Sequence, residues 1–188
     1  MSEDLCMLSA SEGVSRRAVL GLGVVVLGSG IVGCSAGDGS GDEVDPSWVS
    51  EQVGPITVRH PKEWVEKPST SKVFTKMFTD DKRSMLIAGN YSNNADPVLA
   101  YGKLDVMAAG ALESYHSRGH QDLTVQGAAK AAKCPFEFTQ DGQKMAGWWL
   151  IASAAASVGK TAVVSLNLPA DDDSSIVDKI ASTMVFKQ

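Results

Sequence analysis

Hydrophobic and polar residues alternate in several stretches of the chain, as they do in half-buried β-strands. The alternation is clearest near the C-terminus, where Val164, Leu166 and Leu168 are separated by Ser165 and Asn167. Short apolar runs bounded by Gly, Pro or Asp add further candidate strands. Together these patterns predict strands over residues 56–59, 73–78, 85–90, 123–128, 136–139, 144–154 and 161–168, with turns at Cys134-Pro135, Asp141-Gly142 and Val158-Gly159.

In the middle of the chain, apolar residues recur every three to four residues, which is typical of a helix. Asp96 is placed to cap this helix, and Pro97 suits its first position. We expect the helix to run to about Arg118, where Gly119 would end it. Side chains three and four residues apart form its expected buried stripe, which consists of Tyr101, Leu104, Ala108, Leu112 and Tyr115.

A second helix is expected near the C-terminus. The acidic run 171–173 and Ser174 precede it, and negative charge favours a helix N-terminus. Its apolar face would consist of Ile176, Val177, Ile180 and Met184. The order of strand, helix, strands and helix predicts an α+β fold, in which an antiparallel β-sheet packs with a long middle helix and a C-terminal helix.

The N-terminal region has the organisation of an export signal. Arg16 and Arg17 precede an apolar run over residues 18–33, and the sequence at 15–20 resembles a twin-arginine signal. As a helix, this run would span about 24 Å, which is less than the ~30 Å hydrocarbon core of a bilayer. We therefore expect a cleaved signal peptide rather than a transmembrane anchor. The general secretory route is the alternative export pathway.

The end of the apolar run resembles the lipobox of bacterial lipoproteins. Ile31, Val32 and Gly33 are followed directly by Cys34, which is the residue that would be acylated after cleavage. A diacylglycerol thioether supplies two acyl chains, enough for stable membrane attachment. The alternative is a chance cysteine after an apolar run. The pattern predicts a lipid-anchored protein on the extracytoplasmic face of the cell membrane.

These features divide the chain into three parts. Residues 1–33 form the expected signal peptide, residues 34–54 a disordered acidic tether rich in Gly and Ser, and residues 55–188 the folded domain. Trp48 is the exception within the tether, because a large aromatic side chain either docks on the domain or lies at the membrane interface.

Charge and cysteine content narrow the possible functions. The chain has a net charge of −5 and no basic cluster, so no nucleic-acid partner is expected. Of its three cysteines, Cys6 would be removed with the signal and Cys34 would carry lipid. Cys134 would remain alone, which excludes an internal disulfide and predicts a small buried hydrophobic residue, with intermolecular pairing or a reactive thiol as the alternatives.

The element order also resembles a known family. Pro61-Lys62-Glu63-Trp64 follows an early strand, and Thr183-Met184-Val185-Phe186 ends the last helix. In these features, residues 54–188 resemble PsbP-like domains and, more narrowly, lipoproteins of the LpqN/LpqT type from high-GC Gram-positive bacteria. The resemblance implies an α/β/α sandwich that serves as an extracytoplasmic binding or assembly module, without a shared catalytic motif.

One histidine pair is a candidate metal site. His116 and His120 would share a helix face, with Glu113 one turn earlier, as two zinc ligands require. Exposed histidines at a helix end are the alternative interpretation, because Gly119 lies between them and no fourth ligand is evident.

Other candidate motifs fail on spacing. The sequence at 158–161 ends like a phosphate-binding loop, but Ala154 stands where the motif needs Gly. The acidic run 171–173 lacks the alternating ligands of a calcium loop.

Trp148 and Trp149 should point to opposite faces of the sheet, so that one is buried and the other is a possible partner anchor.

The sequence therefore predicts an exported, membrane-anchored lipoprotein with a non-enzymatic binding or assembly domain in the cell envelope. Its expected partner, besides the membrane, is an envelope protein or a small ligand, and no cofactor is expected. Two alternatives remain open. One is a carrier of a lipid or other hydrophobic ligand, which needs an apolar cavity between the long helix and the sheet. The other is a metal-dependent factor or enzyme that uses His116 and His120.

Overall fold

A computed structural model describes residues 45–187 of the chain. Its strands are β1 (Trp48–Val53), β2 (Ile56–Pro61), β3 (Val65–Lys67), β4 (Lys76–Thr79), β5 (Ser84–Ser92), β6 (Glu113–Ser117), β7 (Gln121–Asp122), β8 (Lys130–Gln140), β9 (Gln143–Ser153), β10 (Thr161–Pro169) and β11 (Val185–Phe186). Its helices are α1 (Pro97–Ala111) and α2 (Ser175–Ser182). Neither helix in this part of the chain has the length and apolarity needed to cross a bilayer.

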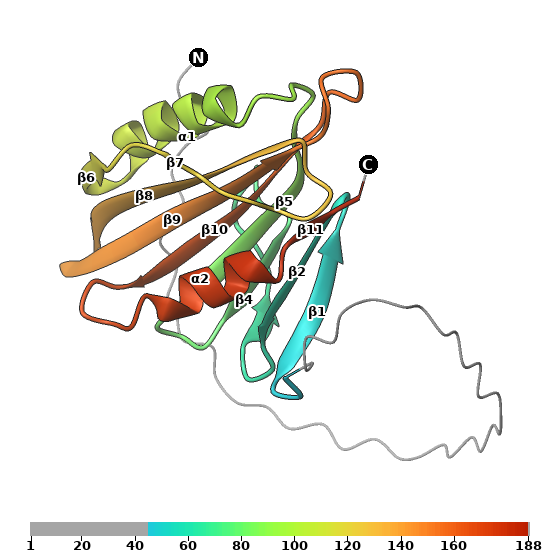
Figure 1. The fold of residues 1–188 in the computed structure, drawn as a ribbon. Coiled ribbons are helices and arrows are strands. Elements are labelled where there is room, and N and C mark those ends of the chain that lie inside the picture. Colours follow the sequence, from blue (N-terminus) through green and yellow to red (C-terminus); the bar gives the residue numbers. More distant parts are fainter. Residues whose placement is uncertain (1–44, 188) are drawn as a thin grey trace, which may run out of the picture.

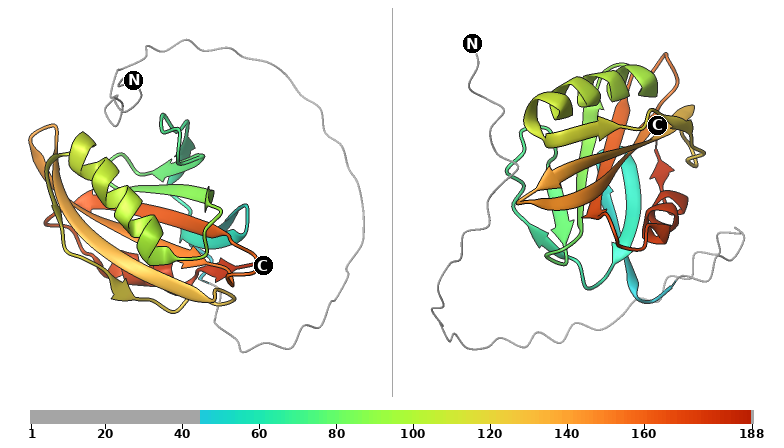
Figure 2. Two further views of the ribbon diagram at one scale, coloured as in Figure 1. Left: turned by 90° about the horizontal axis from the view of Figure 1, so that it is seen from above. Right: turned by 90° about the vertical axis from the view of Figure 1, so that its left-hand side faces the viewer.

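Two antiparallel sheets form the framework. The larger, eight-stranded sheet has the order β3-β4-β5-β10-β9-β8-β6, with β7 also paired to β8. The smaller sheet has the order β1-β2-β11. Helix α1 covers one face of the large sheet, whereas α2 and the small sheet cover the other (Figures 1 and 2). The predicted α+β fold, an antiparallel sheet packed with a middle helix and a C-terminal helix, is confirmed.

The side covered by α2 and the small sheet, here called the α2 face, contains the larger core. Val177 and Ile180 of α2 pack there against Leu150 and Val164 of the central strands, and all four are fully buried. Ile56 and Val58 of β2 close the same core. Alternate residues of β9 and β10 point to this face because side chains alternate along a strand.

The opposite side, here called the α1 face, has a smaller core that is rich in aromatic rings. Phe136, Phe138 and Trp149 lie on the sheet, and Leu104 packs on them from α1. Trp148, by contrast, packs against the α2 face while half-buried. The expected placement of the two tryptophans on opposite faces is therefore confirmed.

Helix α1 begins as the sequence predicts but ends earlier. The Asp96 carboxylate accepts hydrogen bonds from the backbone N–H groups of Val98 and Leu99, at 2.9 and 3.4 Å. The helix stops at Ala111 rather than near Arg118, because Leu112 is extended. Residues 113–117 instead form β6, whose backbone pairs with β8. The spacing of apolar residues does not reveal this, since Tyr115, which the helical pattern includes in the buried stripe, packs against the core of the α1 face from β6.

Three further local predictions are wrong. Cys134-Pro135 is not a turn but lies within the long strand β8. Residues 123–128 form no strand and contribute only a bridge between Gln126 and Val185. The strand expected from residue 73 begins at Lys76. The remaining predicted strands overlap β2, β5, β8, β9 and β10, although β8 begins at Lys130 rather than at residue 136.

Pro135 is tolerated in β8 because its neighbouring strand is interrupted there. The Pro135 carbonyl accepts a hydrogen bond from the Arg118 N–H at 2.9 Å, in the gap between β6 and β7. The nitrogen of a strand residue points to the same side as its carbonyl, so the missing N–H of proline faces this gap rather than a continuous ladder.

The folded domain begins earlier than residue 55. Residues 48–53 form β1, which pairs antiparallel with β2 from Trp48 opposite Pro61 to Val53 opposite Ile56. Trp48 packs against the α2 face, and the Lys179 ammonium lies 4.4 Å from the centre of its ring. The predicted disordered tether to residue 54 is therefore too long, and the tryptophan docks on the domain. The composition of this segment is that of a linker, but its backbone forms hydrogen bonds with β2, and this pairing orders it as a strand.

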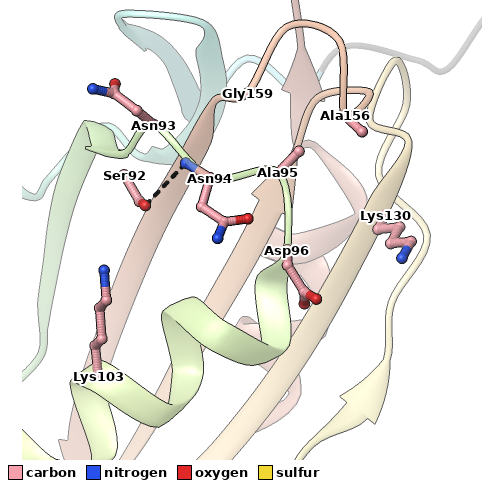
Figure 3. Close-up of a pocket in the computed structure, with 9 residues that line it drawn as sticks. All are labelled: Ser92, Asn93, Asn94, Ala95, Asp96, Lys103, Lys130, Ala156 and Gly159. Atoms are coloured by element: carbon pink, nitrogen blue, oxygen red, sulfur yellow. Dashed lines mark hydrogen bonds between the residues drawn. The ribbon is translucent and has the colours of Figure 1, made fainter.

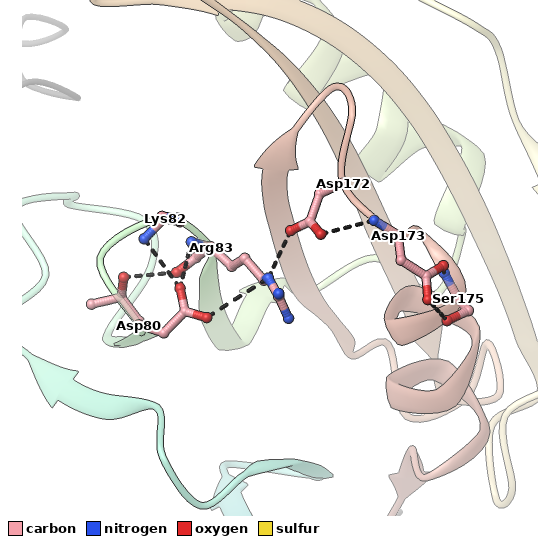
Figure 4. Close-up of polar contacts among 7 residues, drawn as sticks. Asp80, Lys82, Arg83, Asp172, Asp173 and Ser175 are labelled. Atoms are coloured by element: carbon pink, nitrogen blue, oxygen red, sulfur yellow. Dashed lines mark hydrogen bonds and ion pairs between the residues drawn. The ribbon is translucent and has the colours of Figure 1, made fainter.

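The acidic residues before α2 serve local structure. Asp173 accepts hydrogen bonds from the backbone and side chain of Ser175, at 2.9 and 2.6 Å (Figure 4). These bonds hold the pKa of Asp173 below its usual value. Asp172 forms an ion pair with Arg83 at 2.7 Å, which joins the start of α2 to the β4–β5 turn. The helix start is thus organised by Asp173 rather than by Ser174, whose side chain makes no cap bond.

Candidate functional site

A polar pocket lies where the loop after β5 enters α1. Its volume is about 640 Å³. The loop, the first turns of α1, the start of β8 and the β9–β10 connection form its walls (Figure 3). The lining residues are Ser92, Asn93, Asn94, Ala95, Asp96, Lys103, Lys130, Ala156 and Gly159.

Buried hydroxyl groups fix the loop that forms the pocket. Thr161 donates a hydrogen bond to the backbone carbonyl of Asn94. The Ser153 hydroxyl lies 2.8 Å from that of Thr161, and both residues are fully buried. Because the Thr161 proton is engaged with the carbonyl, Ser153 must donate to Thr161. A chain of hydrogen bonds therefore connects the sheet to the loop.

The β9–β10 connection approaches this loop closely at a glycine. Gly159 has φ of +62°, a left-handed conformation that disfavours other residues. A Cβ atom at this position would come within 2.8 Å of the Asn93 carbonyl oxygen. Glycine therefore provides both the backbone conformation and the clearance on this side of the pocket.

Two lysines give the pocket positive charge. Lys103 projects from α1 on one side, and Lys130 lies on the other, with Asn94 and Asp96 between them (Figure 3). Within residues 45–187, neither lysine forms an ion pair. Asp96 is the acidic residue of the lining, and one of its oxygens caps α1.

The solvent side of α1 is unusually apolar. Val98, Leu99 and Val106 are 45, 54 and 74% exposed. Gly102 and Gly110 lie on the same side, and a Cβ atom at either would have no neighbour within 4 Å. We call these five residues the outer face of α1. Large exposed apolar groups on one helix face are a feature of docking surfaces.

A polar cluster lies beneath α1. The Tyr115 hydroxyl donates to Asp105 at 2.6 Å, and those of Tyr101 and Ser117 are 2.7 Å apart. Burial, reinforced by the Asp105 carboxylate, raises the pKa of Tyr115 well above its usual value. Its phenol therefore stays protonated and joins β6 to α1.

Cys134 is fully buried in the core of the α1 face, as the sequence predicts. Burial raises its pKa to about 12. A thiol with this pKa is a poor nucleophile at neutral pH, because only the thiolate reacts rapidly. The residue therefore acts as a small packing group.

The histidine pair does not form the expected helical arrangement. His116 lies on β6 opposite Glu137, and His120 follows that strand in a loop. Both side chains are exposed, and the His120 ring is 5.6 Å from that of Tyr101. The helical spacing that suggested a metal pair is contradicted, since α1 ends at Ala111. Across the described part of the chain, no three or more His, Cys, Asp and Glu side chains are grouped as a metal site requires.

Aromatic rings fill the space between α1 and the sheet, where a hydrophobic carrier would need a cavity. The rings of Phe136 and Trp149 stack with centres 4.3 Å apart, and Tyr115 and Phe138 extend the layer. The pocket described above lies at the end of α1 and has a polar lining. The predicted export signal and lipobox lie outside the described residues, and with them Arg16, Arg17, Ile31, Val32, Gly33 and Cys34.

Sequence reasoning missed the pocket because its residues come from four separate segments. Along the sequence, Asp96 indicates only the start of α1, and Asn93 and Asn94 precede it. Lys130 and Gly159 join them through the pairing of β8, β9 and β10. The adjacent Asn93-Asn94 pair was the one local signal, since it concentrates amide groups beside a helix start.

Comparisons with known proteins find similarity in structure alone. No protein-family model and no curated protein matches the sequence. A Bacteroides thetaiotaomicron VPI-5482 protein gives a TM-score of 0.49 at 11% identity, over 71% of this chain. The match covers 46% of that protein, so this chain spans less than half of its length.

Two further solved structures are similar over more of their own length. The Ran-binding protein Mog1p of Saccharomyces cerevisiae gives a TM-score of 0.48 at 8% identity, over 74% of this chain and 96% of its own. LpqN of Mycobacterium tuberculosis, described as involved in cell envelope biogenesis, gives 0.43 at 16% identity, over 78% and 88%. At these scores and identities, the similarities assign neither a family nor a function to this chain.

Proposed function

We propose that this protein is an exported lipoprotein, anchored through Cys34 on the extracytoplasmic side of the cell membrane. Its domain binds an envelope protein and catalyses no reaction. The lipobox motif supports the anchor, and the apolar outer face of α1 is the observation that carries the binding role. The position at which the chain enters the domain determines how the point of attachment and the outer face of α1 are placed relative to each other.

The described chain begins on the α2 face. The Asp45 carboxylate accepts a hydrogen bond from Lys179 of α2 at 2.9 Å and another from the Ser47 hydroxyl at 2.6 Å. These bonds hold the pKa of Asp45 well below its usual value. The Arg59 guanidinium also donates to the backbone carbonyls of Asp45 and Trp48, at 3.0 and 2.8 Å. The point of attachment is therefore fixed next to α2.

The length of chain before this point limits the distance of the domain from the bilayer. About eleven residues connect Cys34 to Asp45, and at ~3.5 Å per residue they reach no further than about 40 Å. This limit exceeds the ~30 Å diameter of a small domain, so the connection allows the domain to turn. Because the chain enters beside α2, the outer face of α1 lies on the side opposite the attachment and is accessible to a partner (Figure 1).

The outer face of α1 is suited to a protein partner. Burial of Val98, Leu99 and Val106 would stabilise a complex by roughly 25 cal/mol per Å² of apolar surface removed from water. Helix α1 is 15 residues long, or about 22 Å, so it provides a small interface by itself. A partner that contacts the flanking loops as well would reach the area typical of specific complexes.

The anchor is tested by replacing the lipobox cysteine. We expect Cys34→Ser to abolish signal cleavage and the mass added by the diacylglycerol, as measured by intact-protein mass spectrometry of the membrane fraction. Cys6→Ser is the matched control, because Cys6 lies in the segment to be removed. An unchanged mass and distribution of Cys34→Ser would show that this residue carries no lipid.

The binding surface is tested by placing a charge on the outer face of α1. We expect Val106→Asp to remove the adducts formed by chemical cross-linking in intact cells, without changing the stability of the domain by more than ~0.5 kcal/mol. Val65→Asp is the matched control, because Val65 is a 55% exposed valine on β3, away from α1. Adducts that persist in Val106→Asp, or that Val65→Asp removes equally, would contradict this surface.

A further inference from the structure

We infer that the pocket at the start of α1 binds a small hydroxylated anion, such as a phosphorylated polyol. This inference goes beyond the proposed docking of a protein on the outer face of α1. It rests on the volume of the pocket, the chemistry of its lining and the rigidity of its walls, and it does not depend on the lipid anchor.

The volume and lining define the kind of ligand. About 640 Å³ falls within the ~300–1,000 Å³ range of small-molecule sites. Six of the lining residues carry polar or charged side chains, and the other three are alanines and a glycine. An apolar ligand would leave these polar groups without partners, which is unfavourable. The lining therefore favours a polar ligand.

Charge favours an anion. The ammonium groups of Lys103 and Lys130 stand on opposite sides of the pocket, and Asp96 supplies one negative charge between them (Figure 3). Lys133, on the same strand as Lys130, forms an ion pair with Asp178 at 2.5 Å. No such pairing is found for either pocket lysine among residues 45–187. A phosphate or carboxylate within reach of either ammonium would form a charge-assisted hydrogen bond with it.

The remaining polar groups favour hydroxyls on the same ligand. The side-chain amide of Asn94 lies between the lysines and, within the described chain, makes no hydrogen bond (Figure 3). An amide offers both donors and acceptors, and the Asp96 carboxylate adds an acceptor. A hydroxyl group can donate to the carboxylate while it accepts from the amide. Asp96 would repel a simple anion but bind a hydroxyl of a polyol.

The walls are held in place before any ligand arrives. The bond from Thr161 fixes the Asn94 backbone, and the bond from Asn94 N–H to the Ser92 hydroxyl, at 3.1 Å, closes the turn. Gly159 holds the β9–β10 connection against Asn93. A preorganised site loses less conformational entropy on binding, which increases affinity. The ligand needs to order mainly the two lysine side chains.

The test is calorimetric titration of the full-length protein, purified in a phosphate-free detergent buffer, with glycerol 3-phosphate as the probe. We expect saturable binding at one site. Lys103→Met and Lys130→Met should each weaken it about tenfold, which corresponds to loss of about 1.4 kcal/mol. Lys144→Met is the control, because Lys144 is an exposed lysine at the far end of β9 and outside the pocket.

Further titrations test the anionic group and the hydroxyl groups of the ligand separately. Inorganic phosphate should bind more weakly than glycerol 3-phosphate, and glycerol should not bind detectably. Asn94→Ala should weaken the binding of glycerol 3-phosphate but leave the binding of inorganic phosphate unchanged. Competition by nanodiscs that contain phosphatidylglycerol would identify a lipid headgroup as the source, whereas its absence would identify a soluble or wall-linked compound.

Several results would overturn the inference. They are absence of saturable binding, equal weakening by Lys144→Met, and equally tight binding of glycerol. Each is independent of the anchor and of the outer face of α1, because processing of Cys34 and cross-linking at Val106 are measured separately. All four variants change exposed residues, so circular dichroism should show that each remains folded.

Discussion

Helices α1 and α2 cover opposite faces of one sheet, yet they use their side chains differently. The eight-residue α2 places Val177 and Ile180 in complete burial. The fifteen-residue α1 buries mainly small side chains, Ala100 and Ala108 among them, and leaves Val106 exposed. Length therefore does not decide how much a helix contributes to the core. The distribution of large apolar residues around the helix does.

The sheet compensates for the small side chains of α1. On the α1 face, Phe136, Phe138 and Trp149 project from β8 and β9 and supply the volume that the helix lacks. On the α2 face, aliphatic residues from both layers interdigitate. The comparison indicates that the large side chains of α2 form the core on their own face, while α1 leaves large apolar side chains exposed on its solvent side.

The largest expected effect is loss of core packing on the α2 face. Ile180→Ala should reduce the free energy of unfolding by about 3 kcal/mol, because it leaves a cavity at a fully buried position. Urea denaturation measures this change. Val106→Ala on α1 is the matched truncation and should stay within ~0.5 kcal/mol. Similar losses in both variants would remove the distinction between the two helices.

A second test disturbs the aromatic layer of the α1 face. Gly147 lies opposite Phe136 in the β8–β9 ladder, and a Cβ atom at this position would overlap the Phe136 ring. Gly147→Ala should therefore cost about 2 kcal/mol through displacement of the ring, with a changed near-ultraviolet circular dichroism spectrum. An unchanged spectrum and stability would show that the ring layer can rearrange freely.

The opposite sign is expected for a glycine on the outer face of α1. Gly102→Ala should stabilise the domain by about 1 kcal/mol, because alanine favours the helix and the new methyl group meets no atom. Thermal unfolding of Gly102→Ala beside Gly147→Ala gives the comparison directly. Destabilisation by Gly102→Ala would mean that the solvent side of α1 is more crowded than the structure shows.

The smallest expected effect concerns acid stability of the α2 side. His60 is buried against Phe78, with ring centres 4.2 Å apart. Burial lowers its pKa from 6.5, partly opposed by its bond to the Pro61 carbonyl. The unfolded chain then binds a proton more readily than the folded one. Stability should therefore be constant above pH 6.5 and fall as the pH decreases below it.

His60→Phe should remove this component of the pH dependence, as measured by urea unfolding between pH 5 and 8. His116→Gln is the control, because His116 is an exposed histidine on β6, and this variant should keep the slope of the unchanged protein. A slope that persists in His60→Phe would assign the acid sensitivity to other groups.

Most of the fold follows from local patterns. The alternation in 161–168 predicts β10, and Asp96 with Pro97 predicts the start of α1. The errors occur where long-range pairing outweighs a local signal. Pairing of β6 with β8 ends α1 at Ala111, and pairing of β1 with β2 orders a segment whose composition is that of a linker. Pro135 predicts a turn, but a gap in the neighbouring strand accommodates it.

The candidate site was less accessible to sequence reasoning. The pocket joins Lys103 of α1 with Lys130 of β8 and Gly159 of the β9–β10 connection. No spacing rule relates these positions, because their proximity depends on the register of three strands. The histidine pair is the opposite case, in which a local pattern predicts a site that the tertiary structure does not form. His116 and His120 have suitable spacing for a helix, but the backbone there is not helical.

The sequence by itself determined the fold class, the strands β2, β5, β9 and β10 and the N-terminal motifs on which the proposed anchor depends, because each is encoded in residues close together along the chain. Only the tertiary structure decided where α1 ends, that Trp48 belongs to the domain, and that two lysines face one pocket. Those features depend on contacts between distant segments, whose free energy outweighs the local preferences of a few residues.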